Sequence, residues 1–374
     1  MRIIRYTNFR SIQDGNGAER HTAQITEVLK EAGIETDIYI KEETASIPLY
    51  IVIKRAIPVI IDIIRIIPLR NFKNIKSVFR AIRDYIRTEQ QLLPSLRSAA
   101  SIILWECTRN DNFFVPVIAK KYKKKIIAFS HNLESLVPLQ VSSISLKKSP
   151  YWFNEEVSYL SASDKVFCVS KEETLLLKLL GIEAYYYPYF PTKGIEVFYR
   201  GIKEKRKIRT TVLGPLKLLM MGSANNPPTR IGMMNRIQFF SSYNHSDISL
   251  TIAGFCTQTL SEDIHVPSHI KIAGSLTNAE LEQELIETDA ILIHQPATSG
   301  ALTRIPEMLL AGIPIILNFE SARNFYNLDG IYIYQDDKSL MRILSTFQNR
   351  FVEAKIYPPI DEIENFIQVI KSLL

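Results

Sequence analysis

The chain has 374 residues, of which 46% are hydrophobic and 22% charged, with a formal net charge of +6 at pH 7. This composition excludes wholesale disorder, and the length suits two α/β domains of similar size. The three cysteines, Cys107, Cys168 and Cys256, are widely spaced and odd in number, so they indicate neither a disulfide framework nor a clustered metal site. The start, MRIIRYTNF, lacks the apolar core of a signal peptide, and we expect a cytoplasmic protein.

Short apolar runs alternate with amphipathic segments through the N-terminal half. RIIRYTNF predicts the first strand, and a helix is expected to begin near Arg20, after the loop SIQDGNGAERH. Further strands are predicted at TDIYI, SIILWEC, KKIIAFSHN, DKVFCVS and AYYYPYF. Strands that alternate with helices favour a parallel sheet with right-handed crossovers, and we assign this first α/β domain to residues 1–195.

Residues 46–69 depart from this rhythm, because they are rich in Ile, Val and Pro but contain four charged side chains. A helix that spans a bilayer needs about 20 nearly uncharged residues, so this is a poor transmembrane segment. Two interpretations remain open. The segment is either an interfacial amphipathic helix at lipid head groups or a helical excursion packed on the core of its own domain.

A basic stretch overlaps this segment. Only Asp62 and Asp84 oppose its positive charges, and such a patch attracts phospholipid head groups, phosphorylated substrates or nucleic acid. We expect peripheral membrane contact through residues 46–87, with a solvated helix face as the alternative. No module that reads nucleic acid is recognisable, so no nucleic-acid partner is expected. The basic residues are Lys54, Arg55, Arg65, Arg70, Lys73, Lys76, Arg80, Arg83 and Arg87.

The alternation restarts after residues 191–216, a polar and basic segment bounded by prolines that we interpret as the linker between domains. LKLLMMG, ISLTIAG, IKIAG, AILIHQ and IPIILN predict strands, with helices over residues 278–288 and from Leu302 to Leu310. The second α/β domain is expected over residues 210–350. The tail, 355–374, carries apolar residues at helical spacing and is expected to form a closing helix that packs back on the N-terminal domain.

Ligands of open parallel sheets bind at the carboxyl ends of the strands, and two N-terminal loops occupy such positions. The first, DGNGAERH, includes Gly17 at the expected start of a helix, where an anion or sugar is favoured. It lacks the third glycine of a dinucleotide fingerprint, and a tight turn is the alternative. In the second loop, His131 can hydrogen-bond a sugar hydroxyl or act as an acid or base, unless it only holds the structure together.

Two further loops belong to the C-terminal half. In MGSANNPPTR, Gly222 and Ser223 permit close approach of a diphosphate and Arg230 supplies charge, although a proline-capped turn with a surface arginine explains the same residues. In HQPATSGALTRIPEMLLAGIPIIL, a strand ends near His294 and residues 299–301 are expected to open a helix whose amides hold a phosphate.

Arg304 lies one turn into that predicted helix, and Glu307 follows three residues later, so the two side chains are neighbours on its surface. The arginine can meet a phosphate while the glutamate accepts hydrogen bonds from ribose hydroxyls. An internal Arg–Glu pair without a ligand is the alternative.

The block TSGALTRIPEMLLAGIPIIL resembles the donor-site signature of the GT-B glycosyltransferases, especially the retaining family 4 enzymes of bacterial polysaccharide and lipopolysaccharide synthesis. Other matches follow in the family's order over nearly the whole chain: the glycine loop, SHNLES, SASDKVFCVSKEE, MGSANNPPTR and ETDAILIHQP. The resemblance implies an α/β fold of two Rossmann-like domains that face each other across a cleft.

The resemblance also implies roles for individual residues. His131 would lie near the transferred sugar, while Arg230 and Arg304 would neutralise the leaving diphosphate. Since arginines and amide dipoles can manage that charge, no cofactor and no metal are expected. Glu307 would bind the ribose of the donor, and Gly17 would approach it from the N-terminal side. The expected donor-binding residues are Gly17, Gly222, Ser223, His294, Ser299, Gly300, Ala301, Leu302 and Glu307.

The function implied is transfer of a hexose from a nucleoside-diphosphate sugar to a hydroxyl of a glycan or lipid-linked glycan, with retention, in the cytoplasm or at the inner face of the cell membrane. Many relatives carry a first glutamate where this chain has Ser299, and no clear lysine follows Arg230. These departures leave open a non-catalytic relative that binds nucleotide-sugar or glycan. A sugar-nucleotide epimerase is a third interpretation, whereas the missing glycine argues against a dehydrogenase.

Overall fold

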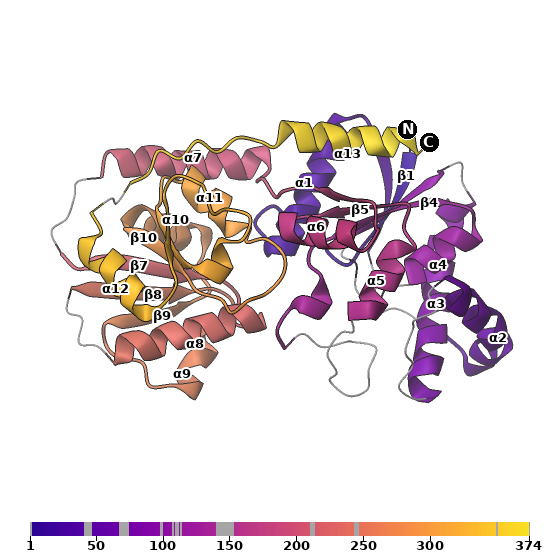
Figure 1. Ribbon diagram of the computed structural model, residues 1–374, viewed down its shortest axis with the longest axis horizontal. Helices are drawn as coiled ribbons and strands as arrows, with labels where there is room; N and C mark the ends of the chain where they lie inside the picture. The colour runs from indigo at the N-terminus through magenta and orange to yellow at the C-terminus, as the bar shows by residue number, and fades with distance from the viewer. Residues whose placement is uncertain are drawn as a thin grey trace. The chain divides into compact units, whose positions relative to one another are not determined.

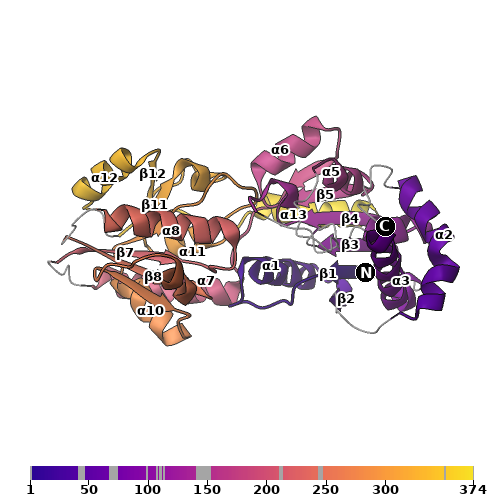
Figure 2. The same cartoon turned by 90° about the horizontal axis from the view of Figure 1, so that it is seen from below.

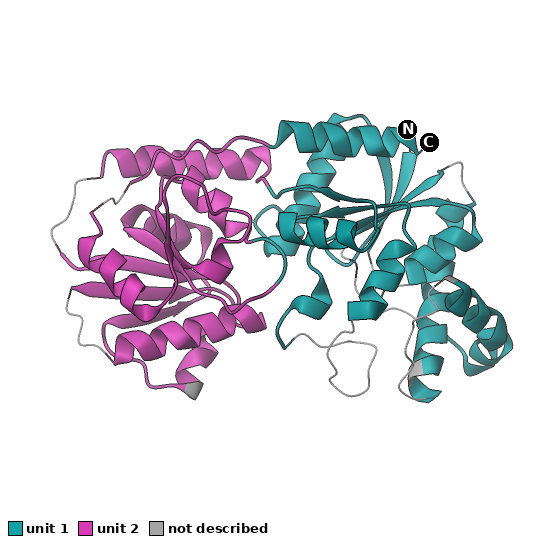
Figure 3. Cartoon of the chain, in the orientation of Figure 1, with its two compact units in different colours: residues 1–189, 299–301, 359–374 teal, residues 190–298, 302–358 magenta. Residues whose placement is uncertain are grey.

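The chain forms two compact units, which Figure 3 distinguishes by colour. Unit 1 comprises Met1–Tyr189, Ser299–Ala301 and Pro359–Leu374, and unit 2 comprises Phe190–Thr298 and Leu302–Pro358. The computed structural model describes residues 2–40, 47–66, 75–97, 100–106, 108, 112, 114–139, 153–209, 214–242, 247–348 and 351–373. Arg70 and Lys73 of the basic stretch and the cysteine Cys107 lie outside these ranges.

Unit 1 is built on a six-stranded parallel sheet in the order β2-β1-β3-β4-β5-β6. Chain order reverses direction between β1 and β3, which are neighbours in the sheet. All of the strands predicted for the N-terminal half are confirmed. They are β1 (Arg2–Thr7), β2 (Glu35–Ile40), β3 (Ile102–Glu106), β4 (Lys125–Ser130), β5 (Lys165–Cys168) and β6 (Ala184–Tyr186).

Helices cover both faces of this sheet (Figures 1 and 2). Successive strand residues point to opposite faces, so Ile3 and Ile102 enter one core while Ile4 and Ile103 enter the other. The first core is closed by α1 (Gly17–Glu31) and α13 (Ile360–Ser372). The second is closed by α2 (Leu49–Ile66), α3 (Ile75–Leu96), α4 (Phe114–Lys121), α5 (Phe153–Ser161) and α6 (Lys171–Leu179), with the 3-10 turn η1 (Glu134–Leu136) after β4.

Two details of unit 1 refine the sequence prediction. The segment whose nature was open forms α2, and its buried residues Val52, Val59 and Ile63 join the core, as the packed-excursion interpretation requires. Helix α1 begins at Gly17 rather than near Arg20. Its start is set by Asn16, which accepts hydrogen bonds from the amides of Ala18 and Glu19, while the Glu19 carboxylate accepts from the Asn16 amide in return.

Unit 2 repeats this architecture with the strand order β12-β11-β10-β7-β8-β9, all parallel. Helices α7, α10 and α11 contribute to one core, and α8, α9 and α12 to the other. The strands are β7 (Leu216–Met221), β8 (Ile248–Ala253), β9 (Ile270–Gly274), β10 (Ala290–Ile293), β11 (Ile315–Asn318) and β12 (Ile331–Tyr334). The helices are α7 (Lys193–Lys207), α8 (Pro227–Ser241), α9 (Leu260–Asp263), α10 (Asn278–Glu287), α11 (Arg304–Leu310) and α12 (Asp337–Thr346), with 3-10 turns η2 (Thr257–Thr259) and η3 (Phe319–Ala322).

Two parallel sheets, each covered by helices on both faces, confirm the predicted α/β class and the two Rossmann-like domains. The interpretation of residues 191–216 as a linker is wrong over most of its length, because α7 occupies Lys193–Lys207. Tyr199, Ile202 and Arg206 are buried at helical spacing against unit 2. The many charges on the outer face of α7 concealed this periodicity in the sequence.

A buried ion pair fixes the centre of unit 1. The Arg5 guanidinium on β1 donates to both carboxylate oxygens of Glu106 on β3, and it also donates to the Thr22 carbonyl and the Thr26 hydroxyl of α1. Both charged side chains have an exposed fraction of 1% or less. The pair therefore ties two strands and a helix together around charges that water does not reach.

We predict that Glu106→Ala lowers the free energy of unfolding by about 3–5 kcal/mol, since it leaves the Arg5 charge buried without its partner. Urea denaturation followed by tryptophan fluorescence measures this, because both tryptophans of the sequence fall within residues 1–189. The double variant Arg5→Met/Glu106→Leu should recover most of the loss. Arg2→Ala is the matched control, because its pair with Asp37 is exposed. Equal effects of Glu106→Ala and Arg2→Ala would contradict the prediction.

Candidate functional site

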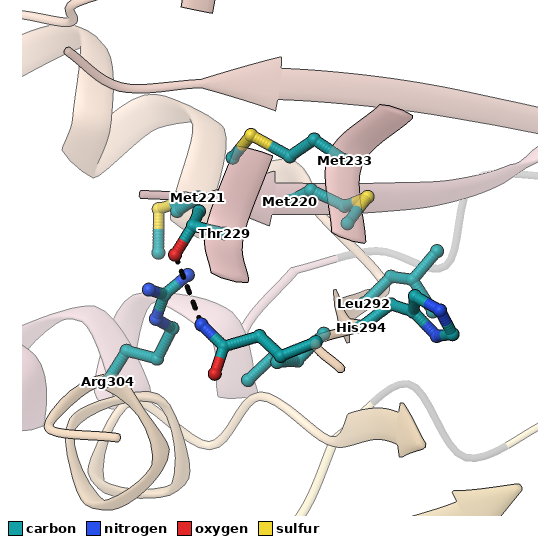
Figure 4. Close-up of a pocket in the computed structure, with 9 residues that line it drawn as sticks. Met220, Met221, Thr229, Met233, Leu292, His294 and Arg304 are labelled. Carbon is teal, nitrogen blue, oxygen red and sulfur yellow. Dashed lines mark hydrogen bonds between the residues drawn. The ribbon is translucent and has the colours of Figure 1, made fainter. Parts of the chain in front are cut away.

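Unit 2 has a pocket where its strand order reverses, between the carboxyl ends of β7 and β10 (Figure 4). The two strands are neighbours in the sheet, but the connections that leave them run in opposite directions, which opens a crevice above the strand ends. The residues that line it are Met220, Met221, Thr229, Met233, Leu292, Ile293, His294, Gln295 and Arg304. The pocket thus has apolar walls, three neutral polar side chains and one arginine.

Gly222 follows β7 and makes room for the arginine. Its φ of +150° lies in the region that favours glycine, and a Cβ at this position would lie 2.9 Å from both terminal nitrogens of Arg304 and from the Thr229 methyl group. The Gly222 amide meanwhile donates to the Ala253 carbonyl of β8. The predicted residues Gly222 and Arg304 are therefore brought together, with the guanidinium lying against the backbone at the strand end.

Hydrogen bonds that the sequence did not reveal hold the wall of the pocket. Gln295 is buried, and its side-chain amide donates to the Thr229 hydroxyl over 3.1 Å. This bond is the dashed line at Thr229 in Figure 4. The Gln295 backbone amide donates to Asn318 at the end of β11, and the Asn318 side chain donates back to the Gln295 carbonyl. Their position as the last residues of predicted strands was the available signal for Gln295 and Asn318.

His294, also predicted, directly follows β10 and is anchored by the edge strand β12 of the same sheet. Its Nδ1 lies 2.8 Å from the hydroxyl of Tyr334 on β12, and the two rings are stacked with centroids 5.9 Å apart. Burial, and secondarily the nearby Arg236 charge, lowers the pKa of His294 to about 4. The imidazole is therefore neutral at pH 7 and contributes a hydrogen-bonding group rather than a cation.

The loop before α8 gives less to this pocket than the sequence suggested. Ser223 accepts a hydrogen bond from the Asn225 amide, and Pro227 and Pro228 remove two amide donors from the first turn of the helix. Arg230 donates to the hydroxyl of Thr259, over 2.8 Å, and is absent from the pocket lining. The structure therefore places Arg304, and not Arg230, at the pocket.

Glu307 lies on α11 one turn beyond Arg304, and its side chain is almost fully buried. Its carboxylate accepts a hydrogen bond from the hydroxyl of Tyr199 on α7, over 3.1 Å. No sequence signal connects two residues that are 108 positions apart. Tyr199 therefore orients this carboxylate.

The helix predicted to open at Ser299–Gly300–Ala301 begins instead at Arg304. These three residues belong to unit 1, whereas Leu302 is buried in a core of unit 2. The chain therefore passes from one unit to the other within the predicted donor-binding segment. The polar groups of Ser299 and Gly300 are hydrogen-bonded within unit 1, and these residues are therefore not part of the helix.

Two hydrogen bonds hold this segment on unit 1. The Ser299 hydroxyl donates to the Leu133 carbonyl over 2.8 Å, and the Gly300 amide donates to Glu173 over 2.8 Å. Gly300 has a φ of +80°, and a Cβ there would lie 1.9 Å from the Asn132 side-chain oxygen. Ser299 and Gly300 thus interact with the loop that follows β4, which carries His131.

His131 follows β4 and lies in an aromatic cluster of unit 1. Its ring is edge-on to His21 of α1, with centroids 4.9 Å apart, and is stacked with Phe9 at 6.1 Å. Both histidines are more than nine-tenths buried, and their four ring nitrogens have no hydrogen-bond partner among the residues that the structure describes. Sequence reasoning found His131 and missed His21, whose place at the end of the GNGAERH loop was the available signal.

Burial keeps these imidazoles neutral. It lowers the pKa of His131 to about 4, with a smaller contribution from the Arg5 charge beneath the cluster. Burial likewise lowers the pKa of His21 well below its usual value, and His131 and Arg5 add to the effect. At neutral pH, each ring therefore offers one donor and one acceptor.

Gly17 is the first residue of α1 and is exposed. The amides of Ala18 and Glu19 in the same turn already donate to the Asn16 cap, and a Cβ at Gly15 would clash with the Glu19 side chain. In this structure the glycine loop acts as a helix cap, and two of the amides expected to receive an anion are engaged.

Comparison of the sequence found no match with a protein-family model or with a curated protein. Solved structures do match in fold. Sucrose-phosphate synthase from Thermosynechococcus elongatus superposes with a TM-score of 0.64 at 13% identity, over 100% of this chain and 95% of that chain. Anabaena HepE in complex with UDP-glucose gives 0.58 at 11% identity, over 99% and 100% of the two chains. UDP-GlcNAc 2-epimerase from Methanocaldococcus jannaschii gives 0.54 at 11% identity, over the full length of both.

These likenesses show the fold, which is the GT-B type with two Rossmann-like domains in one chain. Chemically, the unit 2 pocket offers an apolar floor, the neutral polar groups of Thr229 and Gln295, and the Arg304 guanidinium. Such a set suits a small anion attached to a flat or apolar group. Within the described ranges, His, Cys, Asp and Glu form no group of three or more that could hold a metal ion.

We predict that acid destabilises unit 1 through His131. Its pKa is about 4 when folded and about 6.5 when unfolded, so only the unfolded chain takes up the proton between these values, and stability falls as pH falls through this window. Between pH 7 and pH 5 the loss should be about 2 kcal/mol smaller in His131→Gln than in wild type, measured by urea denaturation. An identical pH dependence of the two proteins would contradict a depressed pKa.

Proposed function

We propose that this protein is a glycosyltransferase that transfers a hexose from a nucleoside-diphosphate sugar to a hydroxyl group of a glycan or lipid-linked glycan. The observation that carries the proposal is the pocket at the β7/β10 reversal, where Arg304 lies against Gly222. A diphosphate needs close backbone approach and fixed positive charge, and this position supplies both. Structural neighbours of the same fold include Anabaena HepE in complex with UDP and glucose.

In this proposal the diphosphate binds Arg304, and the carboxylate of Glu307 accepts hydrogen bonds from the ribose. The Tyr199 hydroxyl holds this carboxylate in position. Arg304 would also stabilise the negative charge that develops on the departing diphosphate, a role that needs no metal. Retention at the anomeric carbon is part of the proposal through the family resemblance alone.

His131 is proposed to act on the transferred sugar. Its buried, neutral ring has two nitrogens without partners in the described structure, and a sugar hydroxyl would satisfy one of them. Transfer would take place in the cytoplasm, at the inner face of the cell membrane where a lipid-linked acceptor is exposed. Arg230, which bonds to Thr259 in this structure, stays in the proposal as a second cation for the diphosphate.

Two other functions of the same fold are testable beside transfer. The full-length likeness to a UDP-GlcNAc 2-epimerase favours conversion of a sugar nucleotide without an acceptor. The Ser299 hydroxyl, which donates to the Leu133 carbonyl where many family 4 relatives have a glutamate, favours a non-catalytic nucleotide-sugar binder.

We predict that Arg304→Ala weakens UDP binding by about 10- to 100-fold, because it removes charge-assisted hydrogen bonds to phosphate. Glu307→Ala should cost about 1–3 kcal/mol of binding free energy, and His131→Ala should leave the dissociation constant of UDP unchanged. Calorimetric titration measures all three. Arg342→Ala on α12 is the control, since this arginine is exposed and outside the pocket lining. Equal affinities of the Arg304→Ala and Arg342→Ala proteins would refute the assigned diphosphate site.

An assay of product formation distinguishes glycosyl transfer, epimerisation and binding without catalysis. Wild type is incubated with UDP-glucose or UDP-GlcNAc, with and without a glycan acceptor, and the sugar products are followed by NMR. Acceptor-dependent UDP release, abolished in Arg304→Ala and reduced in His131→Ala, is the expected result. Epimerised UDP-sugar without acceptor would identify an epimerase. Tight binding with no product would identify the non-catalytic binder.

A further inference from the structure

The outer face of α2 in unit 1 carries an apolar stripe that the protein does not cover. Its side chains are half or more exposed, with Ile57 at 72%. At 3.6 residues per turn they fall within an arc of about 120° on one side of the helix. The stripe consists of Leu49, Tyr50, Ile53, Ile57, Ile61 and Ile64.

This stripe is separate from the face that holds α2 in place. Val52, Val59 and Ile63 lie on an adjoining side of the helix, centred about 120° from the middle of the stripe, and are fully buried in the core that α3 and α4 share. Figure 2 shows α2 at the outer edge of unit 1, with α3 between it and the sheet. The packing of unit 1 therefore does not use these six side chains. A contiguous exposed patch of six large apolar side chains indicates a surface that binds another molecule or a membrane.

The charged residues next to the stripe indicate what kind of surface it binds. Lys54 and Arg65 border it, are exposed and have no ion-pair partner among the described residues. Asp62, the sole acidic residue of α2, is turned away toward Tyr85 and Lys121. The exposed surface of α2 thus combines apolar side chains with unopposed positive charge.

The first turns of α3, like the outer face of α2, expose both apolar and basic side chains. Ile75 and Phe79 are exposed, and exposed Lys76 and Arg83 accompany them without ion-pair partners in the described part of the chain. No helix among the described residues is long and apolar enough to cross a membrane. A helix with an apolar face and a cationic border suits the surface of an anionic bilayer. A protein interface of this size would favour aromatic side chains and Met over a row of isoleucines.

We propose that the outer face of α2 binds in the plane of a bilayer that contains anionic lipids, with the isoleucines inserted below the head groups and the two basic residues among them. The helix of 18 residues is about 27 Å long and would lie along the surface. This binding needs neither a nucleotide nor an acceptor. It agrees with transfer at a membrane surface, as proposed above, but it does not rest on the assigned diphosphate site.

The test is flotation of the full chain with vesicles of phosphatidylcholine, with and without about 30% phosphatidylglycerol. Wild type should bind the anionic vesicles, and high salt should release part of it. The double variant Ile57→Ser/Ile61→Ser should lower the partition coefficient by at least about tenfold. Lys54→Ser/Arg65→Ser should remove most of the preference for the anionic lipid. Leu179→Ser is the matched control, since Leu179 on α6 is as exposed as Ile57 and belongs to the same unit.

The stripe variants change exposed side chains, and their melting temperature and UDP affinity should equal those of wild type. Wild type that stays unbound with both vesicles would overturn the proposal, as would unchanged binding by the double variant. If the double variant instead converts a dimer into a monomer in light scattering and still binds vesicles, a second copy covers the stripe and the proposal is wrong. Loss of UDP binding with intact vesicle binding would count against the transferase alone.

Discussion

At the end of β7, the guanidinium of Arg304 lies against a backbone that tolerates no side chain. A single Cβ on Gly222 would reach both terminal nitrogens of the arginine and the Thr229 methyl group. The reversal of strand order between β7 and β10 provides the space above this point, and the Gln295–Thr229 hydrogen bond keeps its wall in place. Positive charge is thus held beside the backbone at the reversal of strand order, which is where ligands of open parallel sheets bind.

The two units use the same architecture for different local chemistry. In unit 2, the polar side chains of Thr229, Gln295 and Asn318 at the strand ends are hydrogen-bonded to one another, and Arg304 adds a positive charge beside them. In unit 1, the strand ends carry His131 within a buried aromatic cluster, and the Arg5–Glu106 pair lies in the same sheet. Burial keeps the imidazole neutral, so His131 is suited to hydrogen bonding with a neutral sugar rather than to binding a phosphate.

The strands could be predicted from the sequence because every buried strand of a parallel sheet is a short apolar run, and the polar residue that follows each one marks the functional edge. Gly222 and His294 were found at the ends of predicted strands, and Arg304 was found from its place in the helix predicted after them; all three are at the pocket. Tyr199 could not be found, because its contact with Glu307 depends on α7, whose charged outer face resembled a linker. The contact of Arg230 could not be predicted for a related reason, since its place in the loop says nothing about the Thr259 hydroxyl to which it donates.

The sequence also could not predict that the segment after β10 is shared between the two units, with Ser299–Ala301 in unit 1 and Leu302 in unit 2. Small residues such as Ser299 and Gly300 fit a phosphate-binding helix start and a loop bonded to a neighbouring carboxylate equally well. The hydrogen bond from the Gly300 amide to Glu173 decides between them, and it joins residues 127 positions apart. The helix consequently begins at Arg304, and the arginine stands at its first residue rather than one turn inside it.

Hydrogen–deuterium exchange with and without UDP tests most directly whether unit 2 holds a nucleotide at the strand reversal. The account predicts slower exchange in peptides that cover residues 221–230 and 293–305, and loss of this protection in the Arg304→Ala variant. Protection that lies elsewhere in the chain, or that persists in that variant, would contradict the central role of this pocket.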